Sequence, residues 1–461
     1  MPMVELWLIT AVAVALPLML MVSGKLRYVR DYFFLILVAQ VLIYLHFAPS
    51  VAAREVDSAL RLQYATLQLW AIVLLEVPLY LVYLSLRVRL ARSRSVGSST
   101  LARPSGRKSV ALVVGASVGA LAFLVIALRY DLLFRRIGET LAPAQLAVPM
   151  SQFVLYRLFI EGAPVIFGSI LLCYFAARHT GSRKVQLVCL GGLFVVGLVY
   201  GWFLLLNTRL GTIRFVLIVV GLTLYWRSAA RTVARIPLAQ AAALVLVLAY
   251  CVKVIETVRH KHEPGEPSLR LAYFNPLYSY GESLETKTST RLNGIDFMAQ
   301  MTPAAKADGF AHGQAWVVPV FLTFGQFFAR DVADQYKLSL MTNAKSYLMV
   351  RYTPIVSSDP FSCMLTDAFG NFGLAGFALV AIVLALIHAM CGAVLISPRS
   401  GGGLILSLFV LTHAFYFEQE FILLLIGWVK VLPVAAALLV ANPIRVIAAR
   451  AEGMGPHGSF P

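Results

Sequence analysis

Four arginines are the residues of this sequence whose chemistry is easiest to name. Arg209 and Arg214 stand in the short turn 207–214, and Arg291 and Arg351 lie in a long polar segment. An arginine side chain is a fork of donors that matches phosphate oxygens and does not lose its charge. Four such side chains meeting at a membrane surface would suit a lipid diphosphate headgroup. The alternative is that each reaches lipid phosphates or pairs with acids of nearby loops.

Two aspartates and one histidine are candidates for proton transfer. Asp359 and Asp367 lie where the long polar segment joins the next apolar helix, and either could act as a general base or stabilise charge. The simpler alternatives are that Asp359 starts a turn with Pro360 and that Asp367 caps the helix that follows it. His413 lies within apolar sequence, so it is either hydrogen-bonded in a core or part of a polar site.

Metal and cofactor sites are not expected. The cluster His260-Lys261-His262-Glu263 lies in a basic stretch and has no cysteine or aspartate nearby to complete a metal site. The sequence also has no glycine-rich phosphate loop, no dinucleotide fingerprint and no nucleophile elbow. We therefore predict no metal and no cofactor.

Two further features leave alternatives open. Lys430 stands in the middle of an apolar helix and requires either a partner or a water-filled cavity. The apolar run 315–328 is too short to cross a bilayer comfortably. It suits an interfacial or re-entrant helix, or else a buried helix of a loop domain.

These residues must be positioned by helices in lipid. Hydrophobic residues make up 59% of the chain and charged residues only 13%, about half the charged fraction of a soluble domain. The apolar stretches show no strand-like alternation, and only helices or closed barrels satisfy the backbone in lipid. We therefore expect an all-α polytopic membrane protein. The net charge of +17 does not indicate nucleic-acid binding, because the basic residues lie in short runs between apolar segments rather than on one face.

We predict about eleven transmembrane helices, since apolar stretches of about 17–25 residues recur along the chain. They lie near residues 4–22, 32–49, 64–86, 110–128, 161–177, 185–206, 212–226, 236–255, 368–396, 403–417 and 421–443. Every second break between them is basic, which places the N-terminus outside and the C-terminus inside.

This topology divides the chain into four parts. Residues 1–255 hold helices one to eight, and residues 256–366 form a large outer loop that folds as a subdomain. Residues 367–443 hold helices nine to eleven, and residues 444–461 form a cytoplasmic tail. The arginine turn and the junction that carries Asp367 then lie on the same outer face.

Two short segments resemble the O-antigen polymerase family, whose members polymerise oligosaccharide repeat units. The turn Asn207-Thr208-Arg209, followed at once by a brief helix, is similar to a Ser/Thr-Arg turn of these proteins. The stretch from Thr366 to Gly376, TDAFGNFGLAG, resembles their junction between the large loop and a helix. The related O-antigen ligases carry a His-Asn pair shortly before that junction, and the segment 357–362 has no histidine. The predicted helix count differs by one from the family's usual twelve.

The resemblance implies a membrane glycosyltransferase at the outer face of a bacterial inner membrane. It would join polyprenyl-diphosphate-linked oligosaccharides, passing the growing glycan from a lipid-linked donor to a lipid-linked acceptor to make O-antigen, capsule or exopolysaccharide. On this interpretation Arg209, Arg214, Arg291 and Arg351 bind diphosphate, and Asp359 or Asp367 is the base, with His413 as second choice. Membrane lipids and a chain-length regulator are the other expected partners, and nucleic acid is not.

Two other classes remain as alternatives. A lipid-linked oligosaccharide flippase or another polytopic transporter would be expected to show repeated halves and charges distributed along a path through the membrane. An O-antigen ligase or another lipid-dependent glycosyltransferase is the second alternative. Enzymes of that last kind usually carry a catalytic carboxylate in the first outer loop, where Glu55 and Asp57 lie in this chain.

Overall fold

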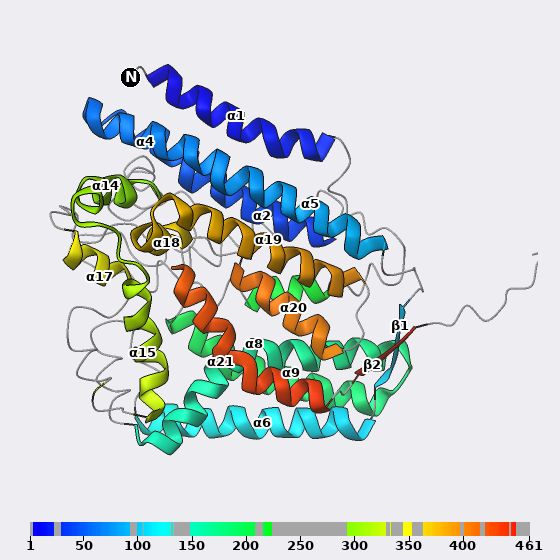
Figure 1. Cartoon of the computed structure of the whole chain (residues 1–461). Helices are drawn as coiled ribbons and strands as arrows, with labels where there is room; N and C mark the ends of the chain where they lie inside the picture. The colour runs from blue at the N-terminus through cyan, green and yellow to red at the C-terminus, as the bar shows by residue number, and fades with distance from the viewer. Residues whose placement is uncertain are drawn as a thin grey trace, which may run out of the picture. The chain divides into compact units, whose positions relative to one another are not determined.

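The computed structural model describes most of the predicted membrane helices and part of the large loop. The described residues are 3–22, 29–92, 99–104, 106–130, 132, 148–207, 215–223, 293–328, 332, 344–352, 363–396, 401–414, 420–441 and 444–448. Within them the chain is predominantly helical (Figure 1).

Seven helical segments of the described chain are long and apolar enough to cross a membrane. They are Phe34–Ala52, Ser58–Leu86, Gly106–Arg129, Ser151–His179, Arg183–Gly201, Leu374–Leu395 and Phe421–Val440. Three shorter apolar helices accompany them, at Val4–Met19, Gln314–Gly325 and Gly401–Thr412. The prediction of a polytopic helical membrane protein is therefore confirmed at this level.

The count of eleven stays a prediction, because part of the chain lies outside the described residues. The predicted helix 236–255 falls there, and of the predicted helix 212–226 only residues 215–223 are described, as helix. The predicted helix 368–396 differs from the structure. It is interrupted at Gly373, between α18 (Met364–Phe372) and α19 (Leu374–Ile396).

Two of the membrane segments contain a π-helical turn, in which the backbone N–H bonds five residues back. In the first, α2 (Val29–Leu42) continues through η1 (Ile43–Phe47) into α3 (Ala48–Ala52). In the second, α4 (Ser58–Trp70) continues through η2 (Ala71–Glu76) into α5 (Val77–Arg92). Asp57 caps the start of α4 by accepting from the Leu60 backbone N–H at 2.8 Å.

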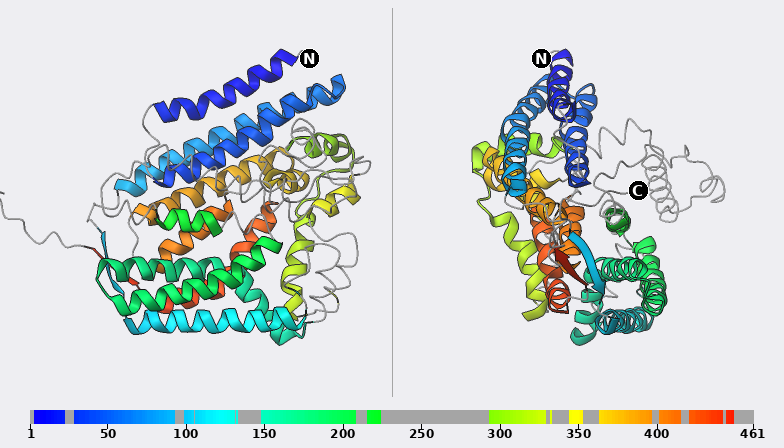
Figure 2. Two further views of the ribbon diagram at one scale, coloured as in Figure 1. Left: turned by 180° about the vertical axis from the view of Figure 1, so that it is seen from behind. Right: turned by 90° about the vertical axis from the view of Figure 1, so that its right-hand side faces the viewer.

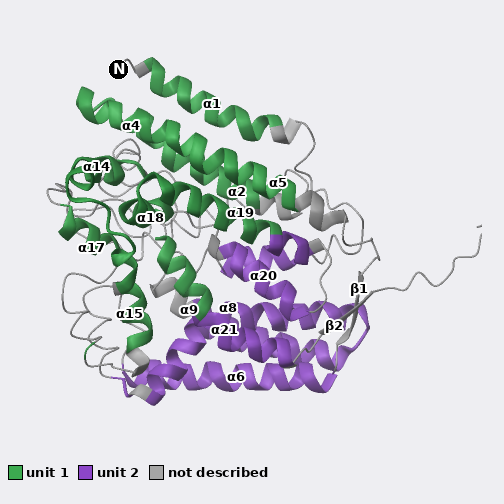
Figure 3. Cartoon of the chain, in the orientation of Figure 1, with its two compact units in different colours: residues 1–86, 277–389, 413–429 green, residues 87–276, 390–412, 430–461 purple. Residues whose placement is uncertain are grey.

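The chain divides into two compact units, each drawn from several parts of the sequence (Figure 3). Unit 1 comprises residues 1–86, 277–389 and 413–429. In it α1 (Met3–Val22) packs against α2 and α4, and α14 (Asp296–Asp308) packs against α4 and α18 (Figure 1). The helices α15 (Gln314–Phe328) and α17 (Ala344–Arg351) pack against each other and against α18.

Unit 2 comprises residues 87–276, 390–412 and 430–461. Its centre is a bundle of three long helices packed side by side: α6 (Gly106–Arg129), α8 (Met150–His179) and α9 (Arg183–Asn207) (Figure 2). The rings of Phe123, Tyr156 and Phe159 stack at the interface between α6 and α8. Unit 2 also holds α20 (Gly401–Ala414) as far as Thr412 and α21 (Phe421–Ala441) from Lys430 onward.

One pair of short strands accompanies the helices, and the all-α class is unchanged by it. Strand β1 (Ser99–Pro104) pairs antiparallel with β2 (Ile444–Ala448). The first belongs to the basic break between predicted helices three and four, and the second to the predicted cytoplasmic tail. Both segments lie on the same side of the membrane in the predicted topology, as their pairing requires.

The helix α15 exposes one apolar face and buries the other. Val317 is 63% exposed, and Val320 and Phe321, on the same face, are each 37% exposed. Ala315 and Leu322 are buried on the opposite face. Of the two alternatives for this run, a fully buried helix does not fit the exposed valines, so the geometry favours a helix that rests against lipid or another apolar surface.

Candidate functional site

The junction between the large loop and the last apolar helices is built around α18, which has its own N-terminal cap. The Thr366 hydroxyl accepts from the Cys363 backbone N–H at 2.9 Å, and Cys363 and Thr366 together form a capping box. The side chain of Asp367, in the next position, is therefore available for a partner elsewhere.

Asp367 caps a different helix from the one that its position in the sequence indicates. Its carboxylate is fully buried and accepts from the backbone N–H groups of Phe421 and Ile422, at 3.1 Å and 3.0 Å, at the start of α21. The indole N–H of Trp316 is the third donor, at 2.9 Å. Burial raises the pKa of this carboxyl to about 6, although the three donors oppose that shift.

Two more side chains hold the first turns of neighbouring helices in the same way. The Asn371 amide oxygen accepts from the backbone N–H groups of Gly313 and Ala315, at 2.8 Å and 3.2 Å, where α15 begins. The Glu420 carboxylate accepts from those of Ala344 and Lys345, at 3.2 Å and 3.0 Å, where α17 begins. The first turns of α15, α17 and α21 are thus each fixed by a side chain from another part of unit 1.

Glu420 is a second buried carboxyl of this cluster. Burial raises its pKa to about 7, and the nearby Asp367 carboxylate acts in the same direction. Two acids therefore share the cluster, and both hold their protons more tightly than they would in water.

Backbone geometry and close packing explain why the junction has glycines at three positions. Gly373 ends α18 at a φ of 59°, a conformation that favours glycine. A side chain at Gly376 would meet the backbone of Ala368 and Phe369, and one at Gly370 would come within 2.6 Å of Leu348. The structure thus explains why glycine is needed at each of the three positions.

Arg351 is the predicted diphosphate ligand that the structure describes, and the junction holds it in place. It ends α17, whose Leu348 packs on Gly370 and whose neighbour Tyr352 donates to the Gly370 carbonyl at 3.3 Å. Its guanidinium lies 3.4 Å from the side-chain oxygen of Gln314, the first residue of α15. The group lies at the surface of the protein, beside a helix N-terminus.

The other predicted site residues fall mostly outside the described part. Arg209, Arg214, Arg291 and Asp359 lie outside the described residues, and His413 lies in α20 with its side chain undescribed. That the three arginines bind a diphosphate together with Arg351, and that Asp359 or His413 acts as the base, stays a prediction.

Lys430, which required a partner, has one in unit 2. Its ammonium lies 3.9 Å from the carboxylate of Glu161 on α8, which also binds the Arg157 guanidinium at 3.1 Å. The three side chains are about a quarter exposed. Two cations around one carboxylate leave the group positively charged within the apolar helices.

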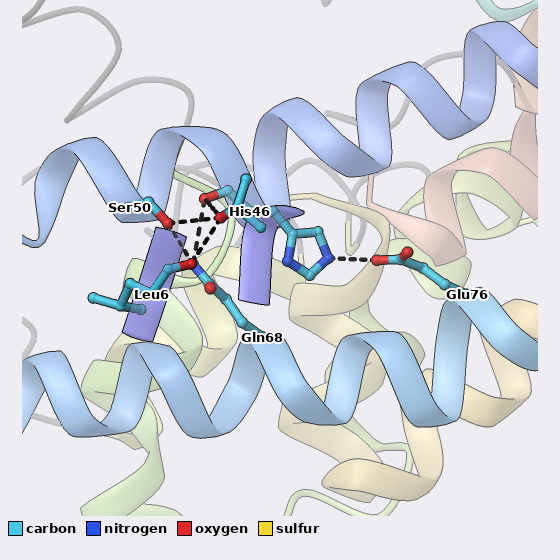
Figure 4. Close-up of polar contacts among 6 residues, drawn as sticks. Leu6, His46, Ser50, Gln68 and Glu76 are labelled. Carbon is cyan, nitrogen blue, oxygen red and sulfur yellow. Dashed lines mark hydrogen bonds and ion pairs between the residues drawn. The ribbon is translucent and has the colours of Figure 1, made fainter. Parts of the chain in front are cut away.

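A buried ionic pair that the sequence analysis did not single out lies within the membrane segments of unit 1. The imidazole of His46 and the carboxylate of Glu76 are in direct contact through Nε2 and Oε1, and both side chains are fully buried (Figure 4). His46 belongs to the π-helical turn η1 and Glu76 ends the π-helical turn η2. Ionisable groups at such depth are rare because each costs several kcal/mol unless it is paired.

A separate cluster of polar side chains surrounds the backbone carbonyl of His46 and reaches α1. The Gln68 amide donates to the Ser50 hydroxyl at 3.2 Å and to the His46 carbonyl at 3.3 Å, and Ser50 shares a hydrogen bond of 3.0 Å with Thr10 (Figure 4). Within the described residues, His46 Nδ1, Gln68 Oε1 and Glu76 Oε2 are buried without a hydrogen-bond partner. Such atoms in a native fold call for an explanation.

One signal for this pair was present in the sequence, since His46 and Glu76 are each a single ionisable residue inside an apolar run. Their pairing depends on how two helices pack, which spacing along the chain does not reveal. Among the described residues, no group of three or more His, Cys, Asp and Glu side chains could hold a metal ion.

Comparison of the chain with protein-family models, with curated proteins and with solved structures finds no match in any of the three.

Proposed function

We propose that this protein is a membrane glycosyltransferase that polymerises polyprenyl-diphosphate-linked oligosaccharide repeat units. The proposal begins with the resemblance of segments 207–209 and 366–376 to oligosaccharide polymerases and with the membrane-spanning character of the chain. The observation that carries it is the link between that junction and Arg351. Gly370 of the junction contacts Leu348 and Tyr352, close neighbours of Arg351 in the chain, and through them helps to position a surface arginine of the kind that would suit a diphosphate.

The link runs through α17, which ends in Arg351, and through α15, which contacts it. Gly370 packs against Leu348 of α17 and accepts a hydrogen bond from Tyr352. Asn371 fixes the first turn of α15, where the Gln314 side chain accepts from Arg351. A guanidinium beside a helix N-terminus offers a fixed positive charge and fork geometry to a phosphate group. In the proposed reaction Arg351 binds diphosphate oxygens with Arg209, Arg214 and Arg291, and stabilises the departing diphosphate without a metal.

The reaction also needs a base for the acceptor hydroxyl. Asp359 and His413 remain candidates for this role. Asp367 is less suited, because three donors already occupy its carboxylate and no protein surface exposes it. Transfer moves the glycan from its diphosphate to the hydroxyl oxygen, breaking the bond to the diphosphate and releasing the hydroxyl proton to the base.

The test uses purified protein in liposomes supplied with a polyprenyl-diphosphate-linked oligosaccharide. We expect products that lengthen by whole repeat units, resolved by mass spectrometry. Arg351→Ala should lower elongation at least tenfold, and Arg351→Lys should restore it only in part because lysine lacks the fork. Lys306→Ala, at an exposed lysine of α14 in the same predicted loop, is the matched control and should elongate normally.

Normal elongation by Arg351→Ala would contradict the role of this arginine. Absence of any elongation by the wild-type protein with a range of lipid-linked donors would contradict the proposed activity. A deletion strain separates polymerase from flippase: single-repeat glycans support a polymerase, whereas loss of every outward-facing repeat unit indicates a flippase.

A further inference from the structure

We propose that His46 and Glu76 together bind one exchangeable proton inside the membrane-spanning part of unit 1. The pair lies in contact, fully buried, between two apolar helical segments. Nothing in the proposed glycosyl transfer uses these residues, and the inference stands whether the chain is a polymerase or a flippase.

The charge balance of the pair gives the number of protons. With one proton the pair is neutral overall, as imidazolium with carboxylate or as imidazole with carboxylic acid, and the proton moves between Nε2 and Oε1 without changing that charge. Loss of this proton would leave a net negative charge, and a second proton would leave a net positive one. Either charge, buried and unpaired, costs several kcal/mol.

The surrounding groups supply no compensating charge. The phenol of Tyr80, on α5, lies near the Glu76 carboxylate. Thr10 and Gln68 donate to the backbone carbonyl of His46 rather than to its ring. The ring of His388 on α19 packs edge-on against Phe34 at 5.9 Å, and Phe34 also contacts Tyr80. Among the described residues, His46 and Glu76 form an ion pair only with each other.

Two observations indicate an exchangeable proton rather than a sealed structural pair. The unpartnered atoms His46 Nδ1, Glu76 Oε2 and Gln68 Oε1 are acceptors or donors left open on the pair and its neighbour. A bound water would satisfy them and give the shared proton a partner with which to exchange, whereas a sealed structural pair would be fully bonded. In addition, each partner lies in a π-helical turn, a distortion that is common at functional sites.

The test is infrared difference spectroscopy on the whole protein in liposomes, comparing H2O with D2O at one pH. We expect a band of the His46–Glu76 pair that shifts in D2O in the wild-type protein, because deuterium replaces the shared proton, and that is lost in Glu76→Gln. In His46→Gln a carboxyl band should persist at a different frequency, because the carboxyl has lost the group that shares its proton. Glu161→Gln removes a part-exposed carboxylate of unit 2 and should leave the band in place.

The result that would overturn the proposal is an H2O/D2O difference spectrum that is the same in Glu76→Gln as in the wild type. A wild-type spectrum without any isotope shift of the pair would overturn it as well. Should Glu76→Gln fail to fold, Glu76→Asp retains a carboxyl and alters its distance from His46. The band must then shift in frequency, and an unshifted band excludes Glu76 as its source.

Discussion

Asp367→Ala should destabilise this protein far more than a typical helix-cap mutation. The fully buried Asp367 carboxylate accepts from two backbone N–H groups of α21 and from the Trp316 indole. Alanine removes both acceptor oxygens and leaves the three donors without this partner.

The magnitude follows from the number of donors left without a partner. Each buried donor that loses its partner costs about 1–3 kcal/mol, so three donors give about 3–9 kcal/mol. The lower half of this range is expected, because the Trp316 contact is only part-buried and water can replace that acceptor. Asp57 is the matched comparison: its exposed carboxylate accepts one hydrogen bond, from Leu60, and Asp57→Ala should cost about 0.5–2 kcal/mol.

The assay is thermal unfolding of purified protein in detergent, followed by the loss of helical circular dichroism. Asp367→Ala should unfold at a clearly lower temperature than Asp57→Ala, or fail to accumulate in the membrane at all. If the two variants unfold at the same temperature, the interpretation of Asp367 as the cap of α21 is wrong.

Asp367→Asn separates capping from catalysis. Asparagine keeps the shape of the side chain and one acceptor oxygen. Its amide nitrogen cannot accept from an N–H group, so the substitution should lower the free energy of unfolding by about 1–3 kcal/mol. A folded Asp367→Asn protein that still elongates glycans excludes Asp367 as the base. If Asp367→Asn folds but is inactive, Asp367 takes part in catalysis, and the argument from its burial and its three donors is wrong.

Three further outcomes are expected. His46→Ala and Glu76→Ala should each cost about 3–5 kcal/mol, and the double variant should cost much less than the sum, measured in a double-mutant cycle in detergent. Gly376→Ala should prevent accumulation of folded protein because its Cβ meets the backbone of α18, whereas Gly115→Ala, in open space on α6, should be tolerated, as shown by size-exclusion profiles. Stability should fall as pH rises from about 4.5 toward the raised Glu420 pKa of about 7, because the folded state holds that proton more tightly than the unfolded chain does. Glu420→Gln should flatten this dependence in thermal unfolding scans, and a slope that is unchanged by the substitution would contradict it.

The sequence predicts the membrane helices well because hydrocarbon thickness constrains their length directly. Segments such as Gly106–Arg129 and Arg183–Asn207 lie close to the predicted spans 110–128 and 185–206. The same reasoning joined residues 368–396 into one helix, since the apolar run is continuous there. The break at Gly373 depends on a single backbone angle, which a hydropathy pattern does not reveal.

Partners distant in the sequence were the hardest feature to predict. Local capping rules assign Asp367 to the helix that follows it, yet its donors lie more than fifty residues away, at Phe421 and Ile422. Lys430 was expected to need a partner, and only the packing of α21 against α8 identifies Glu161. His46 and Glu76 are each a single ionisable residue in an apolar run, and only the packing of their helices shows that they are partners.

The way in which unit 1 caps its helices also limits how a diphosphate could be bound there. The N-terminus of a helix is a ready anion site only while its first N–H groups are free. At α15, α17 and α21 these groups are already bonded to Asn371, Glu420 and Asp367. Two backbone donors at each of the three helix starts are therefore occupied, and two of the occupants are acids that would repel a phosphate when ionised. This arrangement favours binding of a diphosphate by side chains, and arginine is the residue type best suited to that task. This is the physical reason to expect that Arg351→Ala removes binding that no neighbouring helix end can replace.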